Sequence, residues 1–133
     1  MPKGKQPVIY LRVAHGGRAA AQEQELEVRA MLAANGVDSR AMHVSCDLDS
    51  PGDGAGAALL ALLEEATYGQ LQTVIVRDVG RLGREHAVLV AVLVALADAG
   101  VEVVVAEALE HDVPGHARLR ELDGTRVTSP RLT

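Results

Sequence analysis

The sequence has very few aromatic residues: two tyrosines and no phenylalanine or tryptophan in 133 residues. Proteins that bind RNA or single-stranded DNA usually stack bases on aromatic side chains, so this composition argues against that class. The formal net charge is −5, which argues against a protein that coats nucleic acid through bulk electrostatic attraction. Any contact with DNA must therefore be local, through a small cluster of basic residues.

Cysteine and long apolar runs are scarce as well. Cys46 is the only cysteine, so no internal disulfide can form, and the first residues, MPKGKQPVIY, lack the apolar segment of a signal peptide. The longest apolar stretch, AVLVAVLVALADAG, is interrupted at Asp98 and falls short of the roughly 18 residues of a membrane span. We expect a soluble, cytoplasmic domain with one core of small aliphatic side chains.

Segments typical of strands and helices alternate along the chain. The predicted strands are rich in β-branched and aliphatic residues and comprise residues 7–13, 39–46, 73–79 and 101–106. The predicted helices are residues 19–34, the stretch around 59–66, and the stretch after Glu85 that Gly100 ends. This alternation predicts a three-layer α/β domain with a central, mainly parallel sheet of four or five strands.

The helix after Glu85 is apolar on nearly all sides. In addition to the stripe that would face the core, it carries a second apolar face made by Val90, Val94 and Ala97. We expect an apolar face of this kind to be buried against another element and so shielded from water. Either a neighbouring element of the same domain or a protein partner, such as a second copy of the chain, can cover it.

Three arginines follow the first and third predicted strands. Functional groups of open α/β sheets gather beyond the carboxyl ends of the strands, so Arg12, Arg81 and Arg84 meet there if these strands are neighbours. Guanidinium groups bind phosphate oxygens in a fork geometry, and three together suit a phosphodiester. Taken singly, each would be solvated or paired with a carboxylate such as Asp78.

Cofactor and metal motifs fail when their spacing is checked. AHGGRAAA does not match the dinucleotide motif G-x-G-x-x-G, so no nucleotide cofactor is predicted. DLDSPG begins like a calcium loop, but Pro51 and Ala58 stand where ligands belong. The five histidines never fall at helical i, i+4 spacing. This spacing argues against a histidine metal site. We predict neither a metal nor a cofactor.

The order of the segments resembles the catalytic domain of the serine recombinases, the resolvases and invertases. The resemblance covers roughly residues 7–110 and rests on YLRVA, D-x-x-S at Asp47 to Ser50, LLALLEEA, VIVRDVGRLGR and GVEVVVAE. It implies a domain that cuts DNA through a serine hydroxyl attacking a phosphate, without metal or cofactor. It also implies that Arg12, Arg81 and Arg84 hold a phosphate, and that Ser50 positions it.

Three positions depart from the family pattern. Ala14 stands where the resemblance implies the nucleophilic serine, and a methyl group has no lone pair to attack phosphorus. The arginine implied at the start of the second helix is replaced near Gly56, and the aspartate implied before R-L-G-R is Gly80. His15 is adjacent and nucleophilic, but its imidazole places a nitrogen farther out than a serine oxygen.

No catalytic residue is therefore predicted at this degenerate site. Arg18 stands about where the family has a glutamine, and we group it with the other predicted phosphate- or DNA-binding residues: Arg12, Arg18, Arg81, Arg84 and Ser50.

The end of the sequence departs from the family as well. The resemblance implies a long dimerising helix and a helix-turn-helix domain, but only 21 residues follow Asp112, too few for both. We expect a resolvase-like domain in residues 1–112 and a short tail in residues 113–133, made locally basic by Arg118, Arg120, Arg126 and Arg131.

Three functions fit these observations. The favoured one is a serine-recombinase-like domain without cleaving activity, acting as an interaction or regulatory module with weak binding of DNA or phosphate. The second is a component of a DNA recombinase beside a partner chain that supplies the serine. The third is an unrelated α/β module that binds a small anion.

Overall fold

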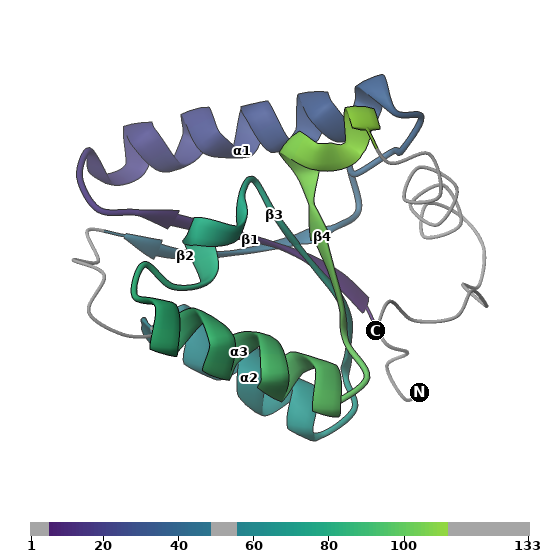
Figure 1. Ribbon diagram of the computed structural model, residues 1–133. Helices are drawn as coiled ribbons and strands as arrows, with labels where there is room; N and C mark the ends of the chain where they lie inside the picture. Colours follow the sequence, from purple (N-terminus) through teal and green to yellow (C-terminus); the bar gives the residue numbers. More distant parts are fainter. Residues whose placement is uncertain (1–5, 49–55, 112–133) are drawn as a thin grey trace.

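The strands form the parallel sheet predicted from the alternating segments, and the first strand lies beside the third. A computed structural model describes residues 6–48 and 56–111, and in these residues four parallel strands lie in the order β2-β1-β3-β4 (Figure 1). The strands are β1 (Gln6–Val13), β2 (His43–Leu48), β3 (Leu71–Val76) and β4 (Glu102–Val105). Because β1 is hydrogen-bonded to β3, the loops that follow these two strands lie side by side.

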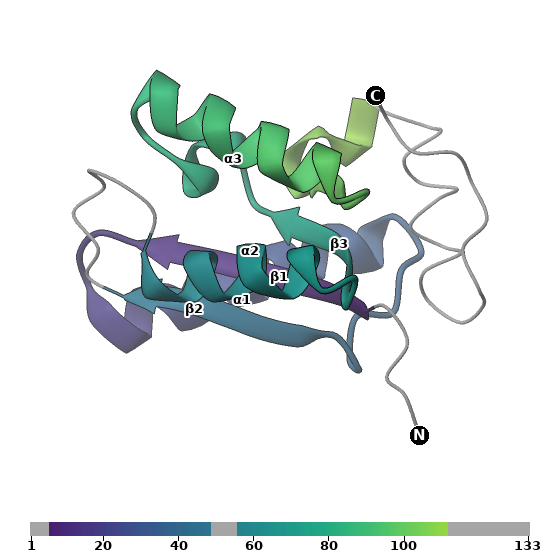
Figure 2. The ribbon, with the colours of Figure 1, turned by 90° about the horizontal axis from the view of Figure 1, so that it is seen from below.

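Helices cover both faces of the sheet, which completes the predicted three layers. Helix α1 (Gly17–Ala34) lies on one face together with the short 3-10 segment η2 (Ala106–His111), whereas α2 (Ala57–Thr67) and α3 (His86–Asp98) lie on the other (Figures 1 and 2). A second 3-10 segment, η1 (Val79–Leu82), links β3 to α3. No helix within the described ranges has both the length and the apolar character needed to cross a membrane.

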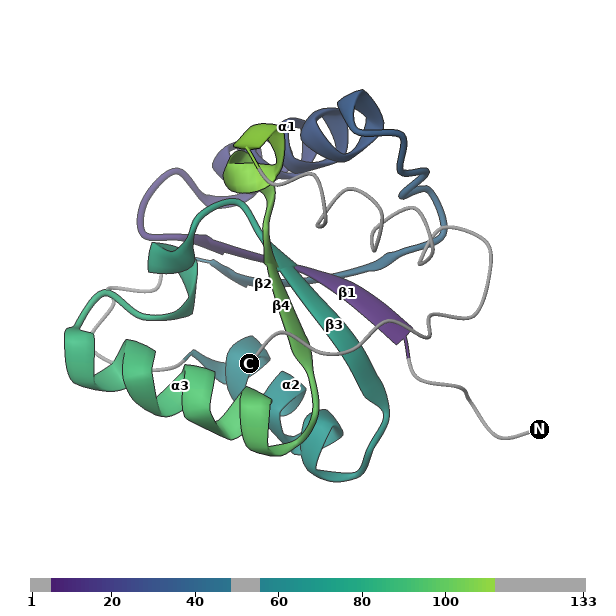
Figure 3. The same cartoon turned by 45° about the vertical axis from the view of Figure 1, so that its right-hand side comes forward.

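The central strand β1 divides the core into two parts. Figure 3 shows α1 on one side of the sheet and α2 and α3 on the other. Ile9 and Leu11 belong to the cluster on the α1 side, whereas Val8 and Tyr10 belong to the cluster with α2 and α3. All residues from Val8 to Val13 are buried, which explains the nearly continuous apolar run of this strand.

Two predicted strands have different limits in the structure. The second was expected over residues 39–46, but β2 begins at His43, because residues 39–42 form a turn in which the Met42 N–H donates to the Ser39 carbonyl at 3.0 Å. The Arg29 side chain holds this turn through the Ser39 carbonyl and hydroxyl. The third strand was expected to reach Val79, but β3 ends at Val76, and Val79 already belongs to η1.

Asp47 holds the start of α2 against the sheet. Its Oδ1 accepts a hydrogen bond from the Ala58 N–H at 2.8 Å, and its Oδ2 accepts from the Leu59 N–H at 3.1 Å and from the Tyr10 hydroxyl at 2.6 Å. The first N–H groups of a helix have no partner inside the helix, and a carboxylate placed there satisfies them and interacts favourably with the helix dipole. Asp47 therefore joins β2, β1 and α2.

This contact also explains the glycine at the start of α2. A Cβ atom added to Gly56 would lie 2.3 Å from Asp47 Cγ, a distance that no side chain tolerates. The carboxylate of Asp47 occupies the space that a side chain at position 56 would need, so the arginine implied by the family resemblance is incompatible with this arrangement.

We predict that Asp47→Ala lowers the free energy of unfolding by about 3 kcal/mol, because two helix N–H groups and the buried Tyr10 hydroxyl lose their acceptor. Denaturant unfolding followed by far-UV circular dichroism measures this change. The matched control is Asp38→Ala, which removes an exposed aspartate and should change stability by less than about 0.5 kcal/mol. Equal effects of the two substitutions would contradict the role of Asp47.

Tyr10 should remain protonated in the folded protein at alkaline pH. Burial, followed by the hydrogen bond to Asp47, raises its pKa above the ordinary value. Since the folded pKa exceeds the unfolded value of about 10, the stabilisation is fully present below pH ~10 and is lost as the pH rises further. In a Tyr68→Phe variant, whose one tyrosine is Tyr10, tyrosinate absorbance should appear only when the protein unfolds; its appearance in the folded protein would refute this prediction.

Candidate functional site

A hollow opens beyond the carboxyl ends of β1 and β3. Its volume is about 400 Å³, and it is lined by Arg12, Ala14, His15, Asp78, Gly80, Arg81 and Arg84. The structure thus brings together three of the arginines that the sequence placed at this edge. A second hollow of about 310 Å³ lies near the start of β1 and β2, and the described residues that line it include neither lysine nor arginine.

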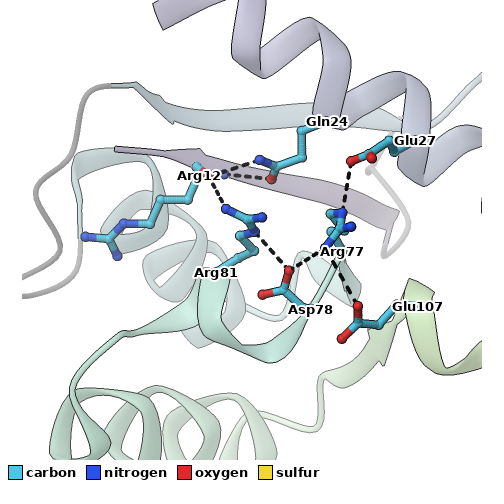
Figure 4. Close-up of polar contacts among 7 residues, drawn as sticks. All are labelled: Arg12, Gln24, Glu27, Arg77, Asp78, Arg81 and Glu107. Carbon is cyan, nitrogen blue, oxygen red and sulfur yellow. Dashed lines mark hydrogen bonds and ion pairs between the residues drawn. The ribbon is translucent and has the colours of Figure 1, made fainter. Parts of the chain in front are cut away.

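The end of β1 is fixed by a glutamine from α1. The Arg12 N–H donates to Gln24 Oε1 at 3.1 Å, and Gln24 Nε2 donates back to the Arg12 carbonyl at 3.1 Å (Figure 4). Both residues are buried, and two hydrogen bonds in opposite directions hold the Arg12 backbone in one orientation. Sequence reasoning missed Gln24, although a polar residue on the buried side of a helix, with Ala21, Val28 and Leu32, is the signal that identifies it.

Arg81 also contacts the Arg12 backbone, from the opposite side. Its Nη1 donates to the Arg12 carbonyl at 3.1 Å, and its Nε lies 3.2 Å from Asp78 Oδ2 (Figure 4). The Arg12 carbonyl therefore accepts from both Gln24 and Arg81. The Arg12 side chain extends away from these contacts (Figure 4), and Arg12 is among the residues that line the hollow.

Asp78 belongs to a chain of ion pairs beside the hollow. Arg77 donates from Nη1 to Asp78 Oδ2 at 3.0 Å and from Nε to Glu27 of α1 at 2.9 Å, and its Nη1 lies 3.7 Å from Glu107 of η2 (Figure 4). The hydrogen bonds to Asp78 and Glu27 raise the pKa of Arg77. This chain of ion pairs links η1 and η2 to α1. It fixes the wall of the hollow in which Asp78 and Arg81 lie.

The remaining predicted residues lie in different places. His15 and Arg84 are exposed at the hollow, and Ala14 is half-buried. Arg18 is exposed in the first turn of α1 and does not line the hollow. Ser50 lies outside the described residues.

The turn between β1 and α1 requires its glycines. Gly16 and Gly17 have φ values of 97° and 52°, in the left-handed region that side chains other than glycine rarely adopt. The turn brings α1 directly behind β1, which allows Gln24 to reach Arg12.

A carboxylate is present in the hollow even though Gly80 replaces the aspartate that the family resemblance implies. Asp78, two residues earlier, lines the hollow and approaches Arg81. In residues 6–48 and 56–111, no three histidine, cysteine, aspartate or glutamate side chains lie close enough together to hold a metal ion. Among the described residues, the site therefore consists of arginines, one carboxylate, one imidazole and small side chains.

The family model "Resolvase, N terminal domain" matches residues 7–121. This chain belongs to the resolvase family. The match confirms the resemblance drawn from Y-x-R-V and R-L-G-R, and the resolvase fold agrees with the parallel sheet described above. A comparison with curated protein sequences finds no match.

Solved serine recombinase structures share the fold. The C-terminal catalytic domain of ISC1926 TnpA, an IS607-like serine recombinase, is 20% identical with a TM-score of 0.62, and the alignment covers 76% of this chain and 68% of that one. The N-terminal catalytic domain of TP901-1 integrase is 19% identical with a TM-score of 0.64, over 89% and 91% of the two chains. A resolvase family site-specific recombinase from Streptococcus pneumoniae is 18% identical with a TM-score of 0.59, over 86% and 83%.

Proposed function

We propose that this resolvase-family domain binds a backbone phosphate of DNA without cutting the strand, and serves as an interaction or regulatory module. One observation carries the proposal: the hollow that gathers Arg12, Arg81 and Arg84 has Ala14 at the place of the nucleophile. Among the residues that line it in the described part of the chain, 6–48 and 56–111, none carries a hydroxyl or a thiol.

The chemistry of these side chains supports binding more than cleavage. Guanidinium groups hold phosphate oxygens through charge-assisted hydrogen bonds, whereas strand cleavage by this route needs a nucleophile that attacks phosphorus. His15 lines the hollow, but nucleophilic attack also requires the attacking atom to be in line with the leaving oxygen. We propose that His15 does not replace the missing serine.

The binding should be weak and sensitive to salt. Attraction between a few arginines and phosphate falls as the salt concentration rises, and the net charge of −5 opposes the approach of DNA. Asp78 adds a negative charge inside the hollow itself. The proposed contact is therefore local and of low affinity.

The face of α3 supports a second part of the proposal, an interaction with another copy of the chain. Val90 is 42% exposed and Val94 is 52% exposed, and Leu60 of the adjacent α2 is 55% exposed. Between His86 and Asp98, α3 contains no charged residue. Burial of such a surface is favourable, and we propose that two copies pair through it.

A DNA substrate that traps cleaved intermediates tests the missing cleavage. We expect no denaturant-resistant protein–DNA adduct from the native sequence, since Ala14 cannot form a phosphoester bond. Denaturing gel electrophoresis of end-labelled DNA is the measurement, and His15→Ala is the companion variant. An adduct that forms with the native protein and disappears with His15→Ala would show that the imidazole attacks, and would overturn this proposal.

Light scattering coupled to size exclusion tests the pairing of α3. We expect a dimer at protein concentrations of about 100 μM, within the range of weak complexes, and a monomer for Val94→Glu, which places a charge in the apolar face. The control is Leu26→Glu, because Leu26 is 69% exposed on α1, away from α3. A native protein that remains strictly monomeric would exclude the proposed interface.

A further inference from the structure

We propose that Asp78 is a built-in counter-ion that holds Arg81 against the protein and thereby lowers the affinity of the hollow for phosphate. The inference rests on the proposed function, because it concerns the same hollow. The inference assigns a regulatory role to one residue of this hollow. An incoming phosphate must displace the Asp78 carboxylate before Arg81 can bind that phosphate.

The two contacts of Arg81 leave neither edge of its guanidinium free. An arginine binds phosphate with two parallel donors, either Nη1 with Nη2 or Nε with Nη2. In this structure Nη1 donates to the Arg12 carbonyl at 3.1 Å, and Nε lies 3.2 Å from Asp78 Oδ2. Each two-donor edge therefore has one nitrogen already engaged by the protein, so bidentate binding of phosphate requires one contact to break.

The contact with Asp78 is the weaker of the two. Arg81 Nε is buried and within ion-pair distance of Asp78, but it makes no hydrogen bond. The bond from Nη1 to the Arg12 carbonyl, by contrast, has hydrogen-bond geometry. We infer that phosphate competes with Asp78 for the edge formed by Nε and Nη2, while Nη1 stays on Arg12.

Asp78 cannot simply turn away from Arg81. The same oxygen, Oδ2, accepts a hydrogen bond from Arg77 Nη1 at 3.0 Å. Arg77 is in turn paired with Glu27 at 2.9 Å and lies 3.7 Å from Glu107, so acidic residues of α1 and η2 hold it in place. The carboxylate thus stays at the wall of the hollow, where it engages Arg81 and repels an anion.

Of the described residues that line the hollow, Asp78 is the one acidic residue. Gly80, next to Arg81 in the sequence, has no side chain that could take its place. Asp78→Asn should therefore remove the acidic charge of the lining with little change in side-chain volume, which makes it the direct test.

The experiment measures binding of a short fluorescent DNA duplex by anisotropy, and of pyrophosphate by calorimetry, both at low salt. We expect Asp78→Asn to bind both ligands about fivefold more tightly than the native protein does. This ratio corresponds to a change of roughly 1 kcal/mol in the binding free energy. Asp78→Glu keeps the charge and should restore weak binding. The matched control is Glu107→Gln, which removes a carboxylate from Arg77 without changing the lining; its affinity should change less than about twofold.

A double-mutant cycle then tests whether Asp78 acts through Arg81. Arg81→Ala should weaken binding about fivefold more in the Asp78→Asn background than in the native protein, where Asp78 engages Arg81. Loss of the contact between Arg81 and the Arg12 carbonyl affects both backgrounds and cancels in the cycle. Equal losses in the two backgrounds would overturn the inference. So would a gain with Glu107→Gln as large as that with Asp78→Asn, since the effect would then be one of overall charge.

A measurement without ligand separates this inference from the proposed function. NMR relaxation of the Arg81 Nε–H group should show a more mobile side chain in Asp78→Asn than in the native protein or Glu107→Gln. If mobility increases but no variant binds DNA or pyrophosphate, the counter-ion role stands and the proposed function fails. If mobility does not change, the counter-ion role is wrong even when DNA binds.

Discussion

The candidate site depends on how the backbone of Arg12 is held. Arg12 is the second-to-last residue of the central strand, and its carbonyl accepts hydrogen bonds from Gln24 on one side and Arg81 on the other, both at 3.1 Å. The first contact fixes α1 against β1, and the second fixes η1 to the same point. Because backbone polar groups that are removed from water must be paired, these contacts satisfy the strand end and place the residues of the hollow together.

Two departures from the family pattern share a physical explanation. In each, a glycine stands where the resemblance implies a charged side chain, and an aspartate nearby uses the adjacent space. Asp47 lies against Gly56 and binds the first N–H groups of α2. Asp78 lies near Gly80 and pairs with Arg81. At both positions, an aspartate therefore lies where a larger side chain on the glycine would have to fit.

The sequence predicted the layers of the fold and the meeting of the arginines for a clear reason. Apolar periodicity identifies buried strands and helices, and the parallel order of β1 and β3 brings Arg12 and Arg81 to one edge. It named Asp78 as a carboxylate that could pair with one of these arginines, as Arg81 does, but it did not predict the roles of Gln24 or Asp47. Those roles come from side-chain contacts between segments far apart in the chain, such as Arg81 with the backbone 69 positions earlier. The wrong start of the second strand has a similar origin, because a long-range contact with Arg29 shapes the turn that precedes it.

The contact between Gly56 and Asp47 restricts the evolutionary paths open to this protein. A mutation that introduces arginine at position 56 places its first side-chain carbon 2.3 Å from Asp47 Cγ, so the aspartate must first release α2, at a cost in stability. A serine at position 14 takes one amino-acid replacement, whereas an arginine at position 56 requires a second, compensating change. Position 56 is therefore constrained by epistasis with Asp47.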